Sequence, residues 1–300
     1  MRETLRFDTD DEIKNAVMTY GGLYTTMQWD DAYYRPSDYT YYYDGSGGNH
    51  AVTIVGWDDN KDTPATTNGA WLIKNSWGAG FGNAGYFWLS YADTAGGNAA
   101  VSFQDAVAPD TFSSVYYYDD FGEVYDYNMP WAFNAFTPTA AEDLTAVQFW
   151  TLADGASYDI QVYDTFSGGT LSNLLASTTG TAAFAGSHTV DLPSAVALTP
   201  GDSFYVWLNI TNGGDWPMAV DYAYSGYSSA STANPEESYY SADGVAWSDL
   251  TTGFNSTTNF CIKALTAAGE PPPACTSWIW RPARRRAAST SATGSPAMFS

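Results

Sequence analysis

Residues 47–60 read GGNHAVTIVGWDDN, and residues 71–91 read WLIKNSWGAGFGNAGYFWLSY. Both contain apolar runs rich in β-branched and aromatic residues, bounded by glycine, asparagine or aspartate, which is the pattern of β-strands. His50 stands at the start of the first run, and Asn75 follows an apolar run in the second, just before Trp77 and Gly78. The two stretches predict strands of an antiparallel sheet or barrel, with a histidine and an asparagine at strand ends.

A short helix is predicted ahead of these strands. Thr9 and Glu12 have the spacing of a capping box, and apolar residues recur at helical spacing up to Tyr20, before Gly21. We expect one helix over about residues 10–20, followed by a strand in GGLYTTMQW at residues 21–29.

From about Val107 onward the chain changes character. Short strand candidates alternate with turns rich in glycine, serine, threonine and Pro-Gly, and no helical period lies between them. This pattern predicts an antiparallel β-sandwich and a mainly β fold. The strand candidates lie at residues 144–152, 157–164, 188–192, 203–210, 218–222 and 258–265.

The predicted organisation has three parts: a first domain at residues 1–106, a sandwich at 107–268, and a tail at 269–300. The tail begins as a proline linker and continues in arginine, alanine and serine with little pattern, unlike anything before it. We interpret it as disordered or as the product of a frame shift.

Charge and cysteine content narrow the class of protein. Subtracting the four arginines and one glutamate of residues 270–300 from the totals of 11 basic and 33 acidic side chains leaves 7 and 32, a formal charge of −25. Such an acidic surface repels phosphate backbones, so nucleic acid is not an expected partner. Cys261 and Cys275 form no CxxC pair, and neither a metal site nor a disulfide framework is predicted.

The chain shows no segment of the kind that enters a membrane. No apolar run reaches the roughly 18 residues of a membrane helix. The first residues lack the basic and then apolar regions of a signal peptide. We expect no membrane span and no export signal in these 300 residues.

A histidine and an asparagine placed in this way suit one catalytic chemistry. A thiolate nucleophile needs an imidazole that stabilises it and then delivers a proton to the leaving amine. An asparagine oxygen that accepts the other ring N–H holds the imidazole in one tautomer without adding charge, and a tryptophan over that bond keeps water away. Taken singly, His50, Asn75 and Trp77 are better interpreted as structural residues; their joint pattern favours catalysis.

The two opening stretches, together with DDEIKNAVMTYGGLYTTM at residues 10–27, resemble the second half of papain-like cysteine peptidases of the C1 family. The likeness extends to the N-H-A-V and K-N-S-W-G runs and covers about residues 8–105. It implies the barrel-like half of a papain fold, a peptide or protein substrate, and proteolysis that needs no cofactor.

The resemblance also assigns roles to individual residues. It implies that His50 is the catalytic imidazole, that Asn75 orients it, and that Trp77 shields their hydrogen bond, with Asn49 and Gly78 as supporting residues.

One part of the family's machinery has no counterpart in these 300 residues. Family members carry the nucleophilic cysteine and an oxyanion glutamine on a helix of the other half, about 130–150 residues before the histidine. Only 49 residues precede His50, and none is a cysteine. We expect Cys261 to be a buried strand residue and Cys275 a free thiol, so the chain by itself is predicted to be inactive.

Two explanations remain open for this gap. In the first, Met1 is an internal methionine, and the helical half is encoded upstream. In the second, the chain is a non-catalytic glycan-binding or adhesion module with a vestigial peptidase half. We favour the first, because a protein used only for binding has little reason to keep His50, Asn75 and Trp77 together.

Residues 114–265 resemble the lectin-like β-sandwich that follows papain-like peptidases in some secreted bacterial and archaeal proteins. The resemblance implies an extracellular or cell-surface location and a glycan or surface ligand. Trp216 lies in a predicted turn with Tyr222 beyond it, and both are candidate ligand-binding residues because exposed aromatic rings stack on sugar rings. We interpret Trp207 as core, and Asp119 with Asp120 as a solvated acidic loop.

Overall fold

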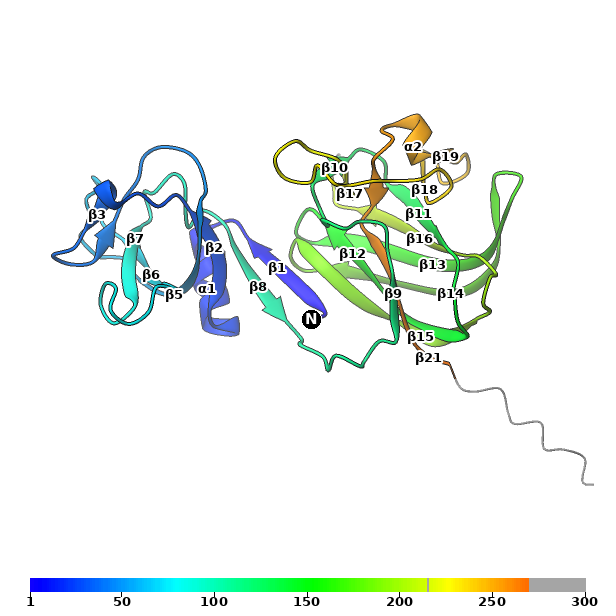
Figure 1. Cartoon of the computed structure of the whole chain (residues 1–300), viewed down its shortest axis with the longest axis horizontal. Helices are drawn as coiled ribbons and strands as arrows, with labels where there is room; N and C mark the ends of the chain where they lie inside the picture. The colour runs from blue at the N-terminus through cyan, green and yellow to red at the C-terminus, as the bar shows by residue number, and fades with distance from the viewer. Residues whose placement is uncertain (215, 270–300) are drawn as a thin grey trace, which may run out of the picture. The chain divides into compact units, whose positions relative to one another are not determined.

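A computed structural model describes residues 1–214 and 216–269, and it is mainly β. All of the predicted tail except Gly269 therefore lies outside the described residues, and so does Cys275. In the first region (Figure 1), the elements are β1 (Glu3–Phe7), α1 (Asp10–Tyr20), β2 (Leu23–Met27), the 3-10 turn η1 (Asp31–Tyr33), β3 (Tyr34–Arg35), β4 (Thr40–Tyr41), β5 (His50–Asp58), β6 (Ala70–Lys74), β7 (Tyr86–Ser90) and β8 (Ala100–Gln104).

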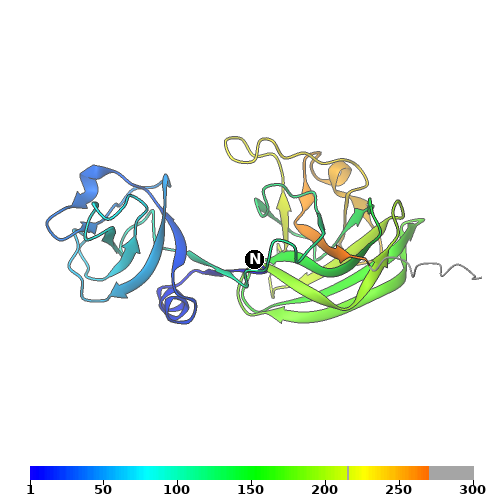
Figure 2. The ribbon, with the colours of Figure 1, turned by 60° about the horizontal axis from the view of Figure 1, so that its bottom comes forward.

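The predicted helix forms where the sequence places it. The Thr9 side chain accepts the backbone N–H of Glu12, and the Glu12 carboxylate accepts the backbone N–H of Thr9, so the capping box is confirmed. Ile13 and Ala16 are buried, and α1, seen nearly end-on in Figure 2, packs against β2 and β5.

No helix among the described residues is long and apolar enough to span a membrane.

The strands of the first region follow the order β3-β4-β7-β6-β5-β2-β8-β1. Neighbours run antiparallel except β4 and β7, which are parallel. The order does not return on itself among the described strands, so the barrel-like sheet is not a closed barrel. The pair β5–β6 brings the start of β5 close to the end of β6, which is where the candidate residues lie.

The second region forms the predicted sandwich. Its elements are β9 (Ser114–Tyr116), β10 (Tyr125–Tyr127), β11 (Trp131–Phe136), β12 (Glu142–Thr151), β13 (Ala156–Ser167), β14 (Thr170–Ala182), β15 (Gly186–Leu198), β16 (Phe204–Thr211), β17 (Met218–Asp221), β18 (Ser238–Ser241), β19 (Ser248–Asp249), α2 (Leu250–Gly253), β20 (Asn259–Phe260) and β21 (Ile262–Ala268).

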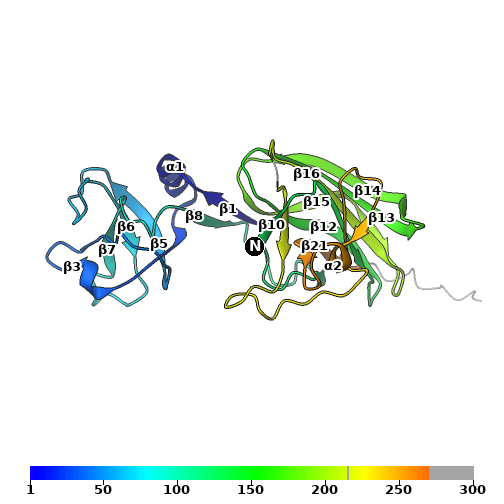
Figure 3. The same cartoon turned by 90° about the horizontal axis from the view of Figure 1, so that it is seen from above.

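Two large sheets enclose the sandwich core, and a small third sheet of β10, β17 and β20 adds buried residues to it. One large sheet has the order β14-β13-β16-β11-β18-β19, and the other contains β15-β12-β21-β9. Figure 3 labels β13, β14 and β16 of the first sheet and β12, β15 and β21 of the second. Side chains such as Phe149, Val206 and Leu208 are buried between them. The edge strand β14 was not predicted from the sequence, because most of its side chains are exposed and it lacks an alternating apolar face.

The burial of Trp207, Asp119 and Cys261 tests three predictions from the sequence. Trp207 is not in the core, as Phe204, Val206 and Leu208 take the buried face of β16 and the period of two puts Trp207 on the other face. Asp119 is not solvated: it is buried and paired with Lys263. Cys261 is buried as expected, although it lies between β20 and β21.

The sheet of the first region runs on into the sandwich through β1. Glu3 of β1 is opposite His188 of β15, and the Thr4 and Ser187 hydroxyls are 2.9 Å apart. Gly186 makes this approach possible, since a Cβ there would lie 1.8 Å from the Thr4 carbonyl oxygen. β1 therefore belongs at once to the first region's sheet and to the sheet that contains β15 and β12.

Candidate active site

Two strand ends place the candidate histidine and asparagine together. His50 is the first residue of β5, and Asn75 directly follows β6. Because these strands are antiparallel, with Thr53 opposite Lys74, the residue after β6 lies beside the start of β5. The His50 Nε2 atom is 2.9 Å from the Asn75 Oδ1 atom.

The surroundings of Asn75 decide which way its amide points. The backbone N–H of Ser76 lies 2.8 Å from the same Oδ1 atom, and a backbone N–H can only donate. The atom facing it is therefore the oxygen, which in turn must accept a proton from His50 Nε2. In the neutral ring this arrangement leaves the proton on Nε2 and the lone pair on Nδ1.

Trp77 covers the imidazole. Its ring stacks on the His50 ring with centroids 4.6 Å apart and an interplanar angle of 24°. Trp77 as a whole is 45% exposed. The chain reaches this position through a turn in which Gly78 has a φ of +83°, a conformation that glycine adopts without strain. Trp77 therefore lies over the His50 ring, and the contribution of Trp77 and Gly78 to catalysis stays a prediction.

Asn49 holds a neighbouring segment. Its Oδ1 atom accepts the backbone N–H of Trp29 at 2.7 Å, and its Nδ2 atom donates to the Trp29 carbonyl at 3.1 Å. The amide therefore fixes the backbone of Trp29 at both ends, in the segment that follows β2.

Trp29 is a residue of the site that sequence reasoning missed. Its ring meets Trp77 edge-on at 4.8 Å and 87°, and it stacks on Tyr41 at 4.8 Å and 19°. The Trp29 ring thus packs against the tryptophan that covers His50. In the sequence, Trp29 stands at the end of a strand candidate. The only local signal of a role in the site is the high density of aromatic residues around it.

We expect Trp29→Ala to loosen the cover over His50. Aromatic pairs contribute about 0.5–1.5 kcal/mol beyond buried area, so losing the edge-on contact releases Trp77 and speeds solvent exchange of the His50 Nε2 proton about tenfold. The exchange rate is measurable by ¹⁵N-resolved NMR, with Trp29→Phe as the variant that restores most of the protection. An unchanged exchange rate in Trp29→Ala would show that Trp29 does not position this pair.

The arrangement suits proton transfer at one ring nitrogen. Nε2 is committed to Asn75, and Nδ1 makes no hydrogen bond to a described residue, so Nδ1 is the atom that can exchange a proton with a nucleophile and a leaving group.

Within residues 1–214 and 216–269, no cluster of three or more histidine, cysteine, aspartate or glutamate side chains could hold a metal ion.

The sandwich residues proposed as ligand-binding lie in an aromatic strip in which Trp216, Tyr125 and Tyr224 are exposed and Tyr222 is half-buried. Trp216 is 45% exposed and meets Tyr125 at 6.4 Å, Tyr125 meets Tyr222 at 5.8 Å, and Tyr222 meets Tyr224 at 6.2 Å. Tyr227 is not part of this strip and instead lies beside Phe121.

Two family models match different parts of the chain. The family model of the lectin-like domain matches residues 115–266, which is 152 of 300 residues, and the model of papain family cysteine proteases matches residues 2–105. The chain belongs to the lectin-like domain family, and its first region is similar to papain family cysteine proteases. The curated relatives include human cathepsin O, 33% identical over 82 residues, and the Giardia intestinalis cathepsin B-like CP3, 40% identical over 80 residues.

Solved structures match both regions at once. Cwp84, a clostridial cysteine protease, after propeptide cleavage, has a TM-score of 0.77 and 26% identity, covering 89% of this chain and 71% of that one. A structure of the cysteine protease and lectin-like domains of Cwp84, a surface layer associated protein of Clostridium difficile, has a TM-score of 0.75 and 27% identity, covering 89% and 63%. The match to cathepsin O covers 26% of this chain and 23% of that protein. The chain therefore spans about a quarter of the length of the curated relatives.

Proposed function

We propose that this chain supplies the acid–base half of a cysteine endopeptidase site. The observation that carries the proposal is the His50–Asn75 bond of 2.9 Å, with Asn75 oriented by Ser76 and His50 covered by Trp77. In this role Nδ1 of His50 takes the thiol proton of the nucleophile and gives it to the leaving amine, while Asn75 keeps the ring in place.

The nucleophile of this proposal lies outside the described residues. Cys261 does not suit the role, because it is buried and burial raises the pKa of its thiol well above the ordinary value, which keeps it protonated. We propose that a segment encoded before residue 1 carries both the thiolate and the oxyanion glutamine. The 300 residues alone then hydrolyse no peptide, since loss of the nucleophile in a comparable triad costs about a millionfold in turnover.

The test compares two proteins on a panel of fluorogenic peptides. We expect no hydrolysis above background from the 300-residue chain, and hydrolysis that iodoacetamide abolishes from the chain extended by its upstream coding sequence. Cys261→Ser in the extended protein serves as the control and is expected to keep its activity.

Either of two results would contradict this proposal. The first is hydrolysis by the 300-residue chain that His50→Ala abolishes, and the second is upstream coding sequence without a cysteine in any frame. The second result would favour the non-catalytic module.

For the sandwich we propose a targeting role at the cell surface. The support is the likeness to Cwp84, which is described as surface layer associated, together with the exposed strip that contains Trp216 and Tyr222. In this role the strip binds a glycan or another surface ligand, because exposed aromatic faces stack on sugar rings.

A further inference from the structure

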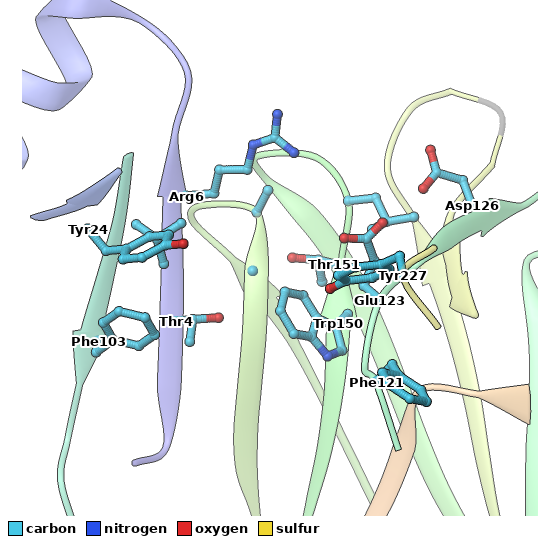
Figure 4. A pocket seen from close by; sticks show the side chains of 14 residues that line it. Thr4, Arg6, Tyr24, Phe103, Phe121, Glu123, Asp126, Trp150, Thr151 and Tyr227 are labelled. Atoms are coloured by element: carbon cyan, nitrogen blue, oxygen red, sulfur yellow. The ribbon is translucent and has the colours of Figure 1, made fainter. Parts of the chain in front are cut away.

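A cavity separate from the His50 site lies where strands of the first region meet the sandwich. Its volume is about 480 Å³, within the range of roughly 300–1,000 Å³ typical of small-ligand pockets. Residues of β1, β2 and β8 form one side. Residues at the ends of β12 and β15, in and just before β10, and in the segment after β17 form the other (Figure 4).

Aromatic side chains stand on both sides of this cavity. On one side, Tyr24 and Phe103 meet edge-on at 6.1 Å, and they are 41% and 56% exposed. On the other, Phe121 and Tyr227 lie 6.5 Å apart near Trp150, and both are exposed. Figure 4 shows the two groups on opposite sides of the opening. Exposed aromatic rings that gather around a hollow are a costly use of apolar surface unless they contact a ligand.

Polar groups of both signs lie among these rings. Glu123 is half-buried and makes no hydrogen bond to a described residue, and burial together with Asp126 raises the pKa of its carboxyl while Arg6 opposes the rise. Arg6 is itself paired with Asp8 at 2.8 Å. The cavity therefore offers hydrogen-bond acceptors in the carboxylates of Glu123 and Asp126 and donors in the guanidinium of Arg6.

The floor of the cavity is rigid. The Thr4 hydroxyl accepts the backbone N–H of Ser187 at 2.9 Å, and the backbone N–H of Arg6 donates to the Ala185 carbonyl at 2.8 Å. Together with the close approach at Gly186, these bonds hold β1 against β15, so the two aromatic groups keep their separation before a ligand arrives.

We propose that this cavity binds a short neutral oligosaccharide. The sugar rings would lie against Tyr24 and Phe103 on one side and Trp150 on the other, and their hydroxyls would donate to Glu123 and accept from Arg6. A polyhydroxylated ring fits this set of groups because it has apolar faces and an edge that both donates and accepts. A cation would meet Arg6, and an anion would meet Glu123 and Asp126. The proposal is independent of the peptidase proposal and of the Trp216 strip.

The test uses the whole 300-residue chain and a panel of neutral di- and trisaccharides of glucose, mannose and N-acetylglucosamine, with cadaverine as a cationic probe. We expect saturable binding of at least one saccharide, observed by calorimetry and as a shift of the Trp150 indole N–H in NMR spectra. The double variant Tyr24→Ala, Phe103→Ala is expected to weaken it by about tenfold or more, since each aromatic contact contributes about 0.5–1.5 kcal/mol.

The matched control is Trp216→Ala, which removes an equally exposed ring from the other aromatic strip and is expected to leave the affinity within about twofold. Tyr24 and Phe103 are exposed, so unfolding curves of the double variant should match the wild type. The proposal fails if no saccharide binds, if binding depends on Trp216 and not on Tyr24 and Phe103, or if only cadaverine binds and Glu123→Gln abolishes that binding.

Discussion

Replacing His50 by alanine in the extended, thiolate-bearing protein is expected to lower kcat/KM by at least about 10⁴-fold. His50 would be the group that accepts the thiol proton and returns it to the leaving amine, and the described residues offer no other imidazole near Asn75. His188, the other histidine of the chain, lies in the sandwich strand β15, where it contacts Thr151 and Glu3. A protease assay over a series of peptide concentrations, including concentrations well below KM, gives the measurement.

His50→Gln separates a loss of chemistry from a loss of packing. Glutamine keeps an amide N–H that can reach Asn75 and a side chain that fills the space beneath Trp77, but it cannot take up a proton at neutral pH. We expect it to be about as inactive as alanine. Activity close to that of the wild type in either variant would remove His50 from the mechanism.

Asn75→Ala should have a smaller effect, about 10- to 100-fold, because it removes only the group that orients the ring. The pH profile of kcat/KM should change as well, since the second ring nitrogen loses its fixed acceptor. A purely structural role for Asn75 would instead lower stability and leave the pH profile of the folded fraction unchanged.

In the sandwich, Lys263→Met is expected to lower the free energy of unfolding by about 3 kcal/mol at pH 8. The Lys263 ammonium is 2.6 Å from Oδ2 of Asp119, whose side chain is fully buried, and it is the only basic side chain that pairs with Asp119 among the described residues. Oδ1 of Asp119 already lacks a hydrogen-bond partner among these residues. Removing the ammonium would leave a buried carboxylate with no compensating charge, and chemical denaturation measures the cost.

The cost should depend on pH in a definite direction. Burial raises the pKa of Asp119 to about 6 even though Lys263 opposes the rise. A raised carboxyl pKa means that the native state binds the proton more tightly than the unfolded state, so this contribution to stability is full below about pH 4 and is lost as the pH rises through about 6. Without Lys263 the pKa rises further, so the difference between variant and wild type should shrink at pH 5 and reach its full size near pH 8.

The matched control for this pair is the double variant Asp119→Asn, Lys263→Met. It removes both charges, and it should recover most of the lost stability, because the penalty comes from the unpaired charge rather than from the absence of the pair. A single Lys263→Met variant within about 0.5 kcal/mol of the wild type at pH 8 would show that the ion pair carries no such weight.

Local pattern was sufficient to predict much of the fold. The capping box of Thr9 and Glu12, the helix at about residues 10–20 and the strands that begin at His50 and end before Asn75 follow from spacing and residue type, and the structure places them there. Short strand candidates separated by turns, among them residues 144–152 and 203–210, likewise predicted the sandwich, and β12 and β16 form there. These features depend on contacts within a strand or a turn, which the order of residues encodes directly.

Other features arise between segments that are distant in the sequence, and no local pattern reports them. Whether Trp207 or Val206 faces the core depends on which side of β16 meets the opposite sheet. The buried Asp119 pairs with Lys263, which is 144 residues away in the sequence. The support of Trp77 by Trp29 and the aromatic cavity at the β1–β15 contact have the same origin.

The sequence by itself determined that a histidine and an asparagine stand at strand ends within a papain-like pattern, and that a β-sandwich follows. The tertiary structure alone decided that Asn75 presents its oxygen to Nε2 of His50, which rings cover that bond, and which aromatic side chains surround a cavity. The physical reason is that strand formation depends on neighbouring residues, whereas the direction of a hydrogen bond and the walls of a cavity depend on how separate strands pack together.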